Sequence, residues 1–399
     1  MRRRLISTSL VLCGPLLLII IVCYVVCAPT SFCFFVDRWA SSPDYSPDGE
    51  KIVFRCHFPT LSQALEDVFD DLGQSSSLFQ WGYIWQATEI CTVHTDGRHL
   101  VRLTDNRAID GLPAWSPDGQ FIAYISDPPY APNSTTEQAI HIVSEDGRLR
   151  RFSENLNVEW ERPVWSPDAK KLTFAAEDPV EYELGINLYE AVVESEHIHE
   201  LTALPGDELG ARWSPDGTQL AFIWFPEGYG GPCLTCSKNA AIRLTDAEGS
   251  SDVVVHNFAN IGGLTWSPDG TRLAFWGSPT ADCPDDECIE VYVLDVLSNS
   301  IECLTEQYDL VVTGETAWSP DGERIAFTAR APRAAAIYTI RPDGESLSRL
   351  TSPAAYAGRD LVWTPDGKSI AFVRGIEGEK WHIWFVEIEG GRLKKLRIS

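Results

Sequence analysis

Residues 115–119 read WSPDG, and the same five letters, or near copies of them, occur at seven places in the chain. The copies begin at Tyr45, Trp115, Trp165, Trp213, Trp266, Trp318 and Trp363. Their starts are 70, 50, 48, 53, 52 and 45 residues apart. Proline fixes φ, glycine accepts positive φ, and Ser and Asp can bond to nearby backbone amides, so the motif is typical of a tight turn. A turn that recurs with a nearly constant period indicates a structural repeat.

Strand-like segments surround each copy of the turn. A short apolar run follows it, such as FIAY ending at Tyr124 or RIAF ending at Phe327. A second run comes roughly 20 to 30 residues later and ends in an Asp-Gly or similar pair, which suits a hairpin, as in AIYTIRPDG from Ala336. The unit is therefore strand, SPDG turn, strand, variable loop, strand, hairpin and strand.

Four antiparallel strands in a period of about 40 to 50 residues are typical of a β-propeller blade. We therefore predict an all-β chain that forms a seven-bladed β-propeller of four-stranded antiparallel blades over residues 36–399. Each blade should come from one contiguous stretch, because the first and last turns both have their own flanking strands. The Trp before each turn should pack between neighbouring blades.

The repeats resemble the WD40-like (Pro-Asp) β-propeller repeats of the TolB type, from Val36 to the C-terminus. TolB itself resembles a six-bladed propeller behind a separate α/β domain, and residues 33–45 leave no room for such a domain. The resemblance therefore implies the fold, but not the role of TolB in an envelope-spanning complex. The propeller peptidases that carry this repeat type are not matched either, because the sequence has no GxSxG elbow and no hydrolase-sized segment after the last blade.

Residues 1–35 form a separate segment. MRRR precedes an uncharged apolar run of 19 residues, 10–28, which is long enough to span a bilayer as one transmembrane helix. The arginines on its N-terminal side should keep that end in the cytoplasm and place the propeller on the extracytoplasmic side. We expect an uncleaved signal anchor, because Pro29 would follow the cut; a cleaved signal peptide is the alternative.

The cysteines of the predicted propeller fall mainly into pairs. Cys56 and Cys91 lie on the second and third strands of the first blade, where an antiparallel neighbour relation permits a bridge. The other candidate disulfides lie in variable loops and are Cys233 with Cys236 and Cys283 with Cys288. We expect local disulfides in an oxidising compartment rather than a zinc site, because there is no second CxxC. Cys303 is left over, as a buried free thiol.

The charge of the chain restricts its partners. Asp and Glu number 57 against 32 Lys and Arg, and the formal net charge is −25. This acidity excludes nucleic acid and anionic membrane surfaces as partners of the propeller, because both favour a basic face. We expect no cofactor and no metal: there is no EF-hand loop, and the HIH pair at His197 falls on a solvated hairpin.

The variable loops between second and third strands carry the insertions, all on the face opposite the SPDG turns. The first begins with LSQALEDVFDDL, which has helical spacing, and continues into an aromatic cluster. The candidate binding residues of the first and fourth insertions are Trp81, Tyr83, Trp85, Trp224 and Tyr229. They form either a lid on their own propeller or a contact site for a protein or a carbohydrate.

The sequence therefore predicts a membrane-anchored extracytoplasmic propeller that acts as a non-catalytic scaffold binding an exported protein or a surface glycan. The alternative is a propeller-type enzyme, a glycan lyase or hydrolase, with its site at the channel mouth. Clustered His and carboxylates, or paired carboxylates, at that mouth would favour the enzyme. The sequence does not indicate the oligomeric state.

Overall fold

The structure is a computed structural model. It describes residues 40–57, 88–106, 108–128, 138–152, 156–178, 185–226, 240–249, 252–278, 288–331, 334–352, 359–375 and 382–397. The predicted anchor and all seven connections between second and third strands lie outside these ranges. No helix within them is both long enough and apolar enough to cross a membrane.

The described residues form 29 strands. In blades one to three these are β1 (Ala40–Tyr45), β2 (Lys51–Cys56), β3 (Glu89–His94), β4 (Val101–Arg102), β5 (Ile109–Trp115), β6 (Phe121–Asp127), β7 (Ala139–Ser144), β8 (Leu149–Phe152), β9 (Asn157–Val158), β10 (Val164–Trp165), β11 (Lys171–Glu177), β12 (Ile186–Val192) and β13 (His197–Glu200). In blades four and five they are β14 (Asp207–Trp213), β15 (Gln219–Phe225), β16 (Ala240–Asp246), β17 (Asp252–Phe258), β18 (Asn260–Trp266), β19 (Arg272–Ser278), β20 (Glu290–Asp295) and β21 (Ser300–Cys303). In blades six and seven they are β22 (Val311–Trp318), β23 (Ile325–Ala331), β24 (Ala334–Ile340), β25 (Ser348–Arg349), β26 (Arg359–Trp363), β27 (Ser369–Arg374), β28 (His382–Glu387) and β29 (Leu393–Lys395).

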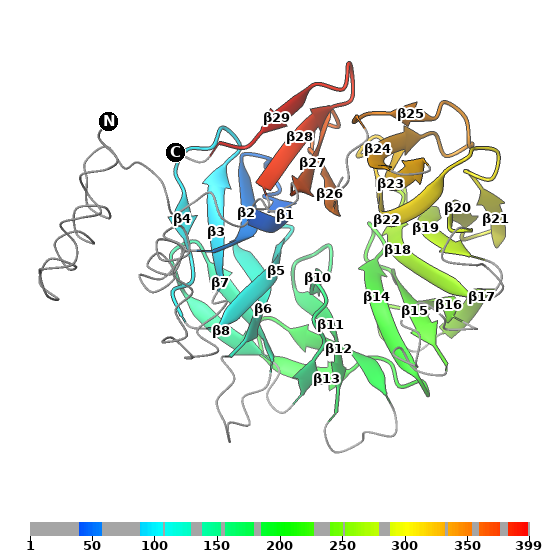
Figure 1. Cartoon of the computed structure of the whole chain (residues 1–399). Coiled ribbons are helices and arrows are strands. Elements are labelled where there is room, and N and C mark those ends of the chain that lie inside the picture. The colour runs from blue at the N-terminus through cyan, green and yellow to red at the C-terminus, as the bar shows by residue number, and fades with distance from the viewer. Residues whose placement is uncertain are drawn as a thin grey trace, which may run out of the picture.

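These strands form seven antiparallel sheets arranged in a ring (Figure 1). Six sheets contain four consecutive strands each, and the third has five because its inner strand is interrupted between β9 and β10. The first strands of successive blades contact one another around the axis, and β1 also contacts β26. The predicted seven blades and their contiguous construction are confirmed.

The SPDG motif forms the same hydrogen-bonded turn in every blade. In the second blade, the Ser116 hydroxyl donates to Asp118 Oδ1 over 2.6 Å, and Asp118 Oδ1 accepts from the backbone N–H of Gln120 over 3.0 Å. The backbone N–H of Phe121 donates to Ser116 Oγ over 2.9 Å, and Gly119 N–H donates to the Ser116 carbonyl over 2.9 Å. The Ser and Asp side chains therefore satisfy backbone amides of the turn, as the sequence predicted.

The same turns also connect neighbouring blades. The proline of one turn lies against the glycine of the next, as Pro47 does against Gly119 and Pro167 against Gly217. At the junction that closes the ring, Pro365 of blade seven lies against Gly49 of blade one. All six glycines of the motif have φ between 67° and 71°, which favours glycine strongly over other residues.

The tryptophans of the motif are buried between blades, as predicted, with exposed fractions of 7–8%. The indole Nε1 of Trp165 donates to the Ala114 carbonyl of the preceding blade over 3.1 Å. Trp266 and Trp363 make the corresponding bonds over 2.9 Å to Arg212 and Ala317. Each of these side chains thus contributes apolar burial and one hydrogen bond to a blade interface.

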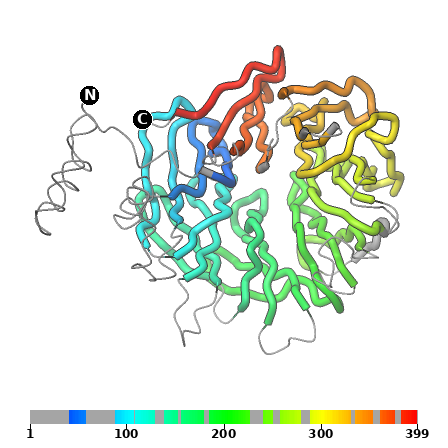
Figure 2. The backbone as a smooth tube through the Cα atoms, viewed as in Figure 1, coloured from blue at the N-terminus to red at the C-terminus, as the bar shows by residue number. Residues whose placement is uncertain are grey.

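Among the described strands, none is exchanged between blades seven and one, and Figure 2 shows the red C-terminal blade next to the blue and cyan first blade. Ser42 N–H donates to Asp360 Oδ2 across this junction over 2.9 Å. An apolar cluster spans the same junction and includes Tyr45, Phe54, Val373 and Phe385. Side-chain packing therefore closes the ring.

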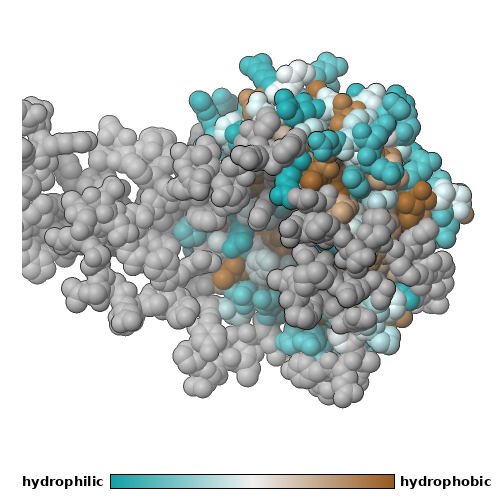
Figure 3. Space-filling model, turned by 45° about the vertical axis from the view of Figure 1, so that its right-hand side comes forward, coloured by the Kyte–Doolittle hydropathy of each residue, from teal (hydrophilic) through white to brown (hydrophobic). Residues whose placement is uncertain are grey.

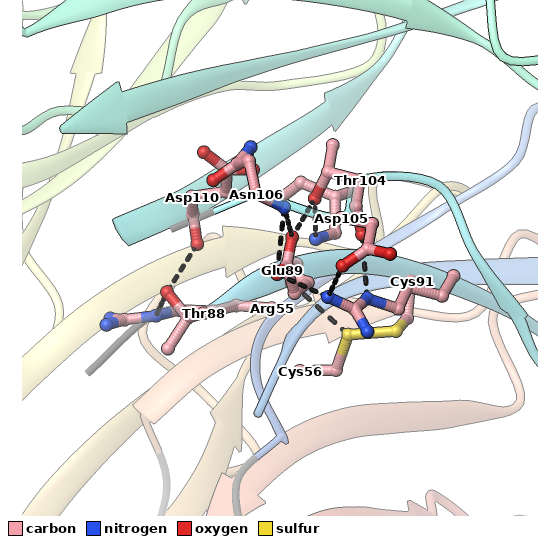
Figure 4. Close-up of a disulfide and its surroundings, with 11 residues drawn as sticks. Arg55, Cys56, Thr88, Glu89, Cys91, Thr104, Asp105, Asn106 and Asp110 are labelled. Atoms are coloured by element: carbon pink, nitrogen blue, oxygen red, sulfur yellow. Dashed lines mark hydrogen bonds and ion pairs between the residues drawn. A yellow bond between two sulfur atoms is a disulfide. The ribbon is translucent and has the colours of Figure 1, made fainter. Parts of the chain in front are cut away.

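The first blade contains the predicted disulfide. Cys56 and Cys91 are bonded with an S–S distance of 1.99 Å, which connects β2 to β3 next to the Glu89–Arg102 ion pair (Figure 4). Cys288 is disulfide-bonded as well, while Cys233, Cys236 and Cys283 lie outside the described residues. Cys303 is free, as expected, and half-buried.

In the third turn, Ala169 stands at the position that glycine occupies in the other turns, with φ 60°. This position therefore allows the free-energy cost of a left-handed backbone to be measured. We predict that Ala169→Gly raises the free energy of unfolding by roughly 0.5–1 kcal/mol, since relief of left-handed strain exceeds the added entropy of the unfolded chain. The matched reverse change, Gly217→Ala, should lower it by about 1 kcal/mol. A Cβ there would lie 3.5 Å from Pro167 Cδ, an ordinary contact, so backbone strain alone acts.

Urea unfolding followed by tryptophan fluorescence gives both values. Opposite signs for the two variants are expected. Equal destabilisation by both would show that packing, and not φ, governs this position.

Candidate functional site: the central channel and its mouth

The strands that line the central channel are irregular. Six inner strands contain a β-bulge, for example between Gly111 and Ala114 in β5 and between Leu209 and Arg212 in β14. Several bulges place a residue at positive φ, among them Ser42, Asp360 and Gly210. A bulge leaves one residue outside the strand pairing and redirects its neighbours, so backbone amides become available to other groups.

Carboxylates from neighbouring blades bind backbone amides of these inner strands. Asp44 Oδ2 accepts from the Trp115 N–H over 2.8 Å. Both carboxylate oxygens of Glu161 accept from the Gly210 N–H, over 2.8 and 3.0 Å. Together with the bond from Ser42 to Asp360, these contacts connect adjacent blades at three junctions. These channel carboxylates therefore have a structural role.

Two arginines lie among these carboxylates. Burial raises the pKa of Asp44 and Glu161, and the nearby guanidinium groups of Arg162 and Arg212, respectively, oppose that rise. Burial likewise raises the pKa of Glu315. The nearby Asp360 carboxylate raises this pKa further, and both arginines oppose the rise. Because Glu315 belongs to blade six and the arginines to blades three and four, the network crosses the channel.

Blade three supplies much of this network through residues 159–163, which read EWERP and separate β9 from β10. These five residues interrupt the pairing with β11: Val158 before them pairs with Ala176, and Val164 after them pairs with Thr173. Figure 1 shows β10 near the centre of the ring. Glu161 bonds to blade four, while an Nη atom of Arg162 donates to the Pro43 carbonyl of blade one over 3.3 Å.

Trp160 lies at the centre of this segment and is 37% exposed. The Arg55 guanidinium lies 5.8 Å from the centre of its ring, and Gly111 leaves space for the indole. Arg55 is the penultimate residue of β2, close to where the first insertion begins. Trp160 is therefore at the end of the channel that bears the insertions.

Carboxylates accompany Trp160 at this end of the channel. Burial raises the pKa of Glu159, and the nearby carboxylates of Asp207, Glu177 and Glu161 raise it further. Asp207 itself accepts from the Ile186 N–H over 2.9 Å. We refer to Arg55, Glu159, Trp160, Glu177 and Asp207 as the channel mouth. Arg55 is held there by a bond from its Nε to Thr88 Oγ1 over 3.0 Å (Figure 4).

Of the five predicted binding residues, only Trp224 lies in the described part of the chain; Trp81, Tyr83, Trp85 and Tyr229 do not. Trp224 is half-buried and packs on the core between blades three and four. Its Nε1 donates to the Pro205 carbonyl over 2.9 Å, and the Arg243 guanidinium lies 4.1 Å above its ring. Its role as a contact for a ligand stays a prediction.

The histidine pair lies where the sequence predicted. The rings of His197 and His199 stack on β13 with their centroids 5.8 Å apart, and both side chains are exposed. His199 Nε2 lies 3.7 Å from Glu190 Oε1. Across the described ranges, no group of three or more His, Cys, Asp or Glu is placed to hold a metal ion.

The channel residues were not among the residues predicted from the sequence, although the sequence contains a signal for them. If the inner strands are aligned on the Trp or Tyr of the turn, Arg162, Glu315 and Asp360 each stand three positions before it. Asp44 and Arg212 each stand one position before it. Charged residues at fixed positions of strands that otherwise carry small or apolar residues indicate a polar channel.

The comparisons with known proteins agree with this fold. Residues 235–399 match the family model of the TolB β-propeller domain. An uncharacterized protein of Agrobacterium fabrum is 27% identical over 226 residues, which are 54% of this chain and 69% of that one. An uncharacterized peptidase of Bacillus subtilis is 23% identical over 255 residues, 64% of this chain but only 32% of the peptidase. The resemblance seen in the repeats is thus confirmed: residues 235–399 match the model of the TolB β-propeller domain.

Solved structures share the fold at low sequence identity. An oligogalacturonate lyase in complex with manganese superposes with a TM-score of 0.63 at 14% identity, over 89% of this chain and 90% of the lyase. A puromycin-hydrolyzing peptidase of Mycobacterium tuberculosis gives 0.63 at 15% identity over 90% of this chain and 53% of the peptidase. The propeller domain of the trilobed protease from Pyrococcus furiosus, described as having an open velcro topology, gives 0.61 at 15% identity over 91% and 97%. At these identities the likeness shows the fold alone.

Arg162 provides a test of the channel network. We predict that Arg162→Ala lowers the free energy of unfolding by about 3 kcal/mol at neutral pH, because it leaves the Asp44 carboxylate without its cation. A carboxyl whose pKa is raised by folding stabilises the fold most below its unfolded pKa and loses this contribution as the pH rises through the folded pKa. The variant should therefore recover stability on acidification more than the wild type does.

Urea unfolding at a series of pH values measures this difference. Asp44→Asn in the Arg162→Ala background should restore part of the stability at neutral pH, because it removes the unpaired charge and keeps an acceptor for the Trp115 N–H. A loss that is independent of pH and unaffected by Asp44→Asn would contradict the electrostatic explanation.

Proposed function

We propose that this protein is a membrane-anchored extracytoplasmic propeller that acts as a non-catalytic binding module for a surface glycan or an exported protein. Its site is the channel mouth together with the insertions on the same face, which include Trp81, Tyr83 and Trp85. The mouth itself suits a sugar ring best. Anchoring follows from residues 1–35, and disulfides are typical of an exported domain.

The observation that carries the proposal is the exposed indole of Trp160. A tryptophan that only packs, such as Trp165, is 7% exposed in this protein, whereas Trp160 is 37% exposed. The residues on either side of it are fixed, because Glu161 bonds to Gly210 and the Glu159 N–H donates to the Ala175 carbonyl over 2.9 Å. The indole is therefore presented to the channel on a rigid support, which favours binding at low entropic cost.

The other residues of the channel mouth suit a polar ligand with a flat face. A sugar ring can stack on the indole while its hydroxyl groups donate to Glu159, Glu177 or Asp207. Arg55 can donate to a ring oxygen or to an acidic substituent. The chain is acidic, with a net charge of −25, and the described residues on the side shown in Figure 3 are mainly hydrophilic. Apolar contact is thus concentrated at a few places such as Trp160.

We predict that Trp160→Ala weakens ligand binding at least about thirtyfold, the loss typical of a central aromatic contact. The melting temperature should stay within a few degrees of the wild-type value, because the ring is partly exposed. The full-length protein in detergent micelles is applied to an array of glycans from its own organism, and its affinity for any glycan it retains is then measured by calorimetry.

Two controls separate binding from folding. Trp160→Phe keeps a stacking surface and should retain most of the affinity. Leu297→Ala removes an apolar side chain that is 89% exposed in the turn between β20 and β21, and should change nothing. If Trp160→Ala binds as the wild type does, the channel mouth is not the site and the insertions must be tested separately.

A second candidate is a propeller-type enzyme, a glycan lyase or hydrolase. It is favoured by the raised pKa of Glu159 among neighbouring carboxylates, since such a carboxyl can act as a general acid. The similarity to an oligogalacturonate lyase over most of both chains makes oligogalacturonate a reasonable first substrate. Release of unsaturated or reducing sugar ends that Glu159→Gln abolishes would support the enzyme. Binding without turnover would support the module.

A further inference from the structure

A cavity of about 440 Å³ lies between blades seven and one, on the face opposite the channel mouth. Blade one contributes Tyr45, Gly49 and Thr95, and blade seven contributes Pro365 and strands of its outer half. We call this space the seam cavity, because it lies at the junction that closes the ring. Its volume is in the range of small-molecule sites in proteins.

The register of blade seven explains one wall of the seam cavity. Phe385 of β28 pairs with Lys394 of β29, and Glu387 and Arg392 follow at the next same-face positions of the hairpin. Side chains that are directly opposite, or two residues apart, point to the same face of a sheet. All four therefore face blade one and line the cavity. Phe385 is buried, whereas the charged residues are exposed.

The floor of the seam cavity contains the one turn motif that begins with tyrosine instead of tryptophan. Tyr45 is 9% exposed, and its buried hydroxyl has no hydrogen-bond partner among the residues that the structure describes. A similar cavity of about 420 Å³ lies between blades three and four, where Trp213 takes the corresponding place. There the indole Nε1 donates to Thr173 Oγ1 over 3.0 Å. A buried hydroxyl without a hydrogen-bond partner costs free energy. The seam cavity contains such a hydroxyl, whereas the indole in its counterpart has a partner.

The rim carries three carboxylates, on Asp48, Asp366 and Glu387, and two cations, on Arg392 and Lys394. Asp48 and Asp366 already accept hydrogen bonds within their own turns, from Ser46 and Thr364 respectively, which hold the pKa of both carboxyls low. Arg392 and Lys394 lie two residues apart on the same face of one wall of the cavity, so both can donate hydrogen bonds to a single anionic group there. They belong to the stretch RLKKLR at residues 392–397, with four cations in six positions of a chain whose net charge is −25. This end of the chain therefore attracts negative charge locally.

We propose that the seam cavity is a binding site for a small organic anion with a flat apolar body. The body lies between Phe385 and Pro365, the carboxylate of the ligand accepts from Arg392 and Lys394, and a polar atom on the body bonds to the Tyr45 hydroxyl. This site lies on the other face of the ring from the channel mouth, so the inference does not depend on the proposed function. A bound ligand contacts both blades and so stabilises ring closure.

The test uses ¹⁹F NMR titration of the full-length protein with 3-fluoro-4-hydroxyphenylacetate, which has the carboxylate, the ring and a hydroxyl group. Its charge-inverted counterpart 3-fluorotyramine is titrated in parallel, and acetate serves as a competitor without the apolar body. We expect saturable binding of the carboxylate, no saturable binding of the amine and no displacement by equimolar acetate. The melting temperature should rise with carboxylate concentration.

Variants assign the binding to the seam cavity. The double change Arg392→Ala with Lys394→Ala should weaken it at least tenfold, because two charge-assisted hydrogen bonds are lost. Tyr45→Phe should weaken it about fivefold and leave the fold intact, since only an unpartnered hydroxyl is removed. Lys395→Ala removes one positive charge on the opposite face of β29 and should have no effect.

Several results would overturn the proposal. Absence of saturable binding at millimolar concentrations would do so, as would equal affinity for 3-fluorotyramine. Displacement by equimolar acetate would show attraction to charge alone. If Lys395→Ala weakened binding as much as the double variant, the site would be the basic stretch in general and not this cavity.

Discussion

The contact between blades seven and one is the constraint on which the rest of this ring depends. None of the described strands is exchanged at that junction, and the ring closes with a core around Tyr45 and Phe385, a hydrogen bond from Ser42 to Asp360 and a contact between Pro365 and Gly49. Each has an equivalent at other junctions, where carboxylates bind bulge amides and prolines lie on glycines. The ring therefore closes with the interactions that connect its other blades.

The turn motif provides two of these interactions at once, which explains why it is repeated so closely. Its Ser and Asp satisfy backbone amides within one blade, while its Pro and Gly form the contact with the neighbours on either side. The preceding tryptophan adds a buried ring, and in four of the six motifs that begin with tryptophan it also adds an indole hydrogen bond across the same interface. A substitution in the motif thus affects a turn and a junction together.

This arrangement also explains what the sequence could predict. The turns, the number of blades and the Cys56–Cys91 bridge depend on local chemistry and strand order, which are visible in the chain. The channel network depends on bulges, because one inserted residue changes which side chains face the axis. Residues 159–163 are the clearest case: EWERP resembles an ordinary polar connection, yet it places Trp160, Glu161 and Arg162 toward different blades.

Blade one contributes residues to both candidate sites, which lie on opposite faces of the ring. Arg55 of β2 reaches the channel mouth, while Tyr45 of β1 forms the floor of the seam cavity on the other face. The strands between them are fixed by the disulfide from Cys56 to Cys91, and Arg102 binds the buried Glu89 over 2.6 Å beside it. The disulfide therefore restrains blade one. This blade forms the ring-closing interface with blade seven, and its Arg55 contacts the exposed indole of blade three. The disulfide and the ion pair thus hold the register of β2 and β3 in the blade on which ring closure and both candidate sites depend.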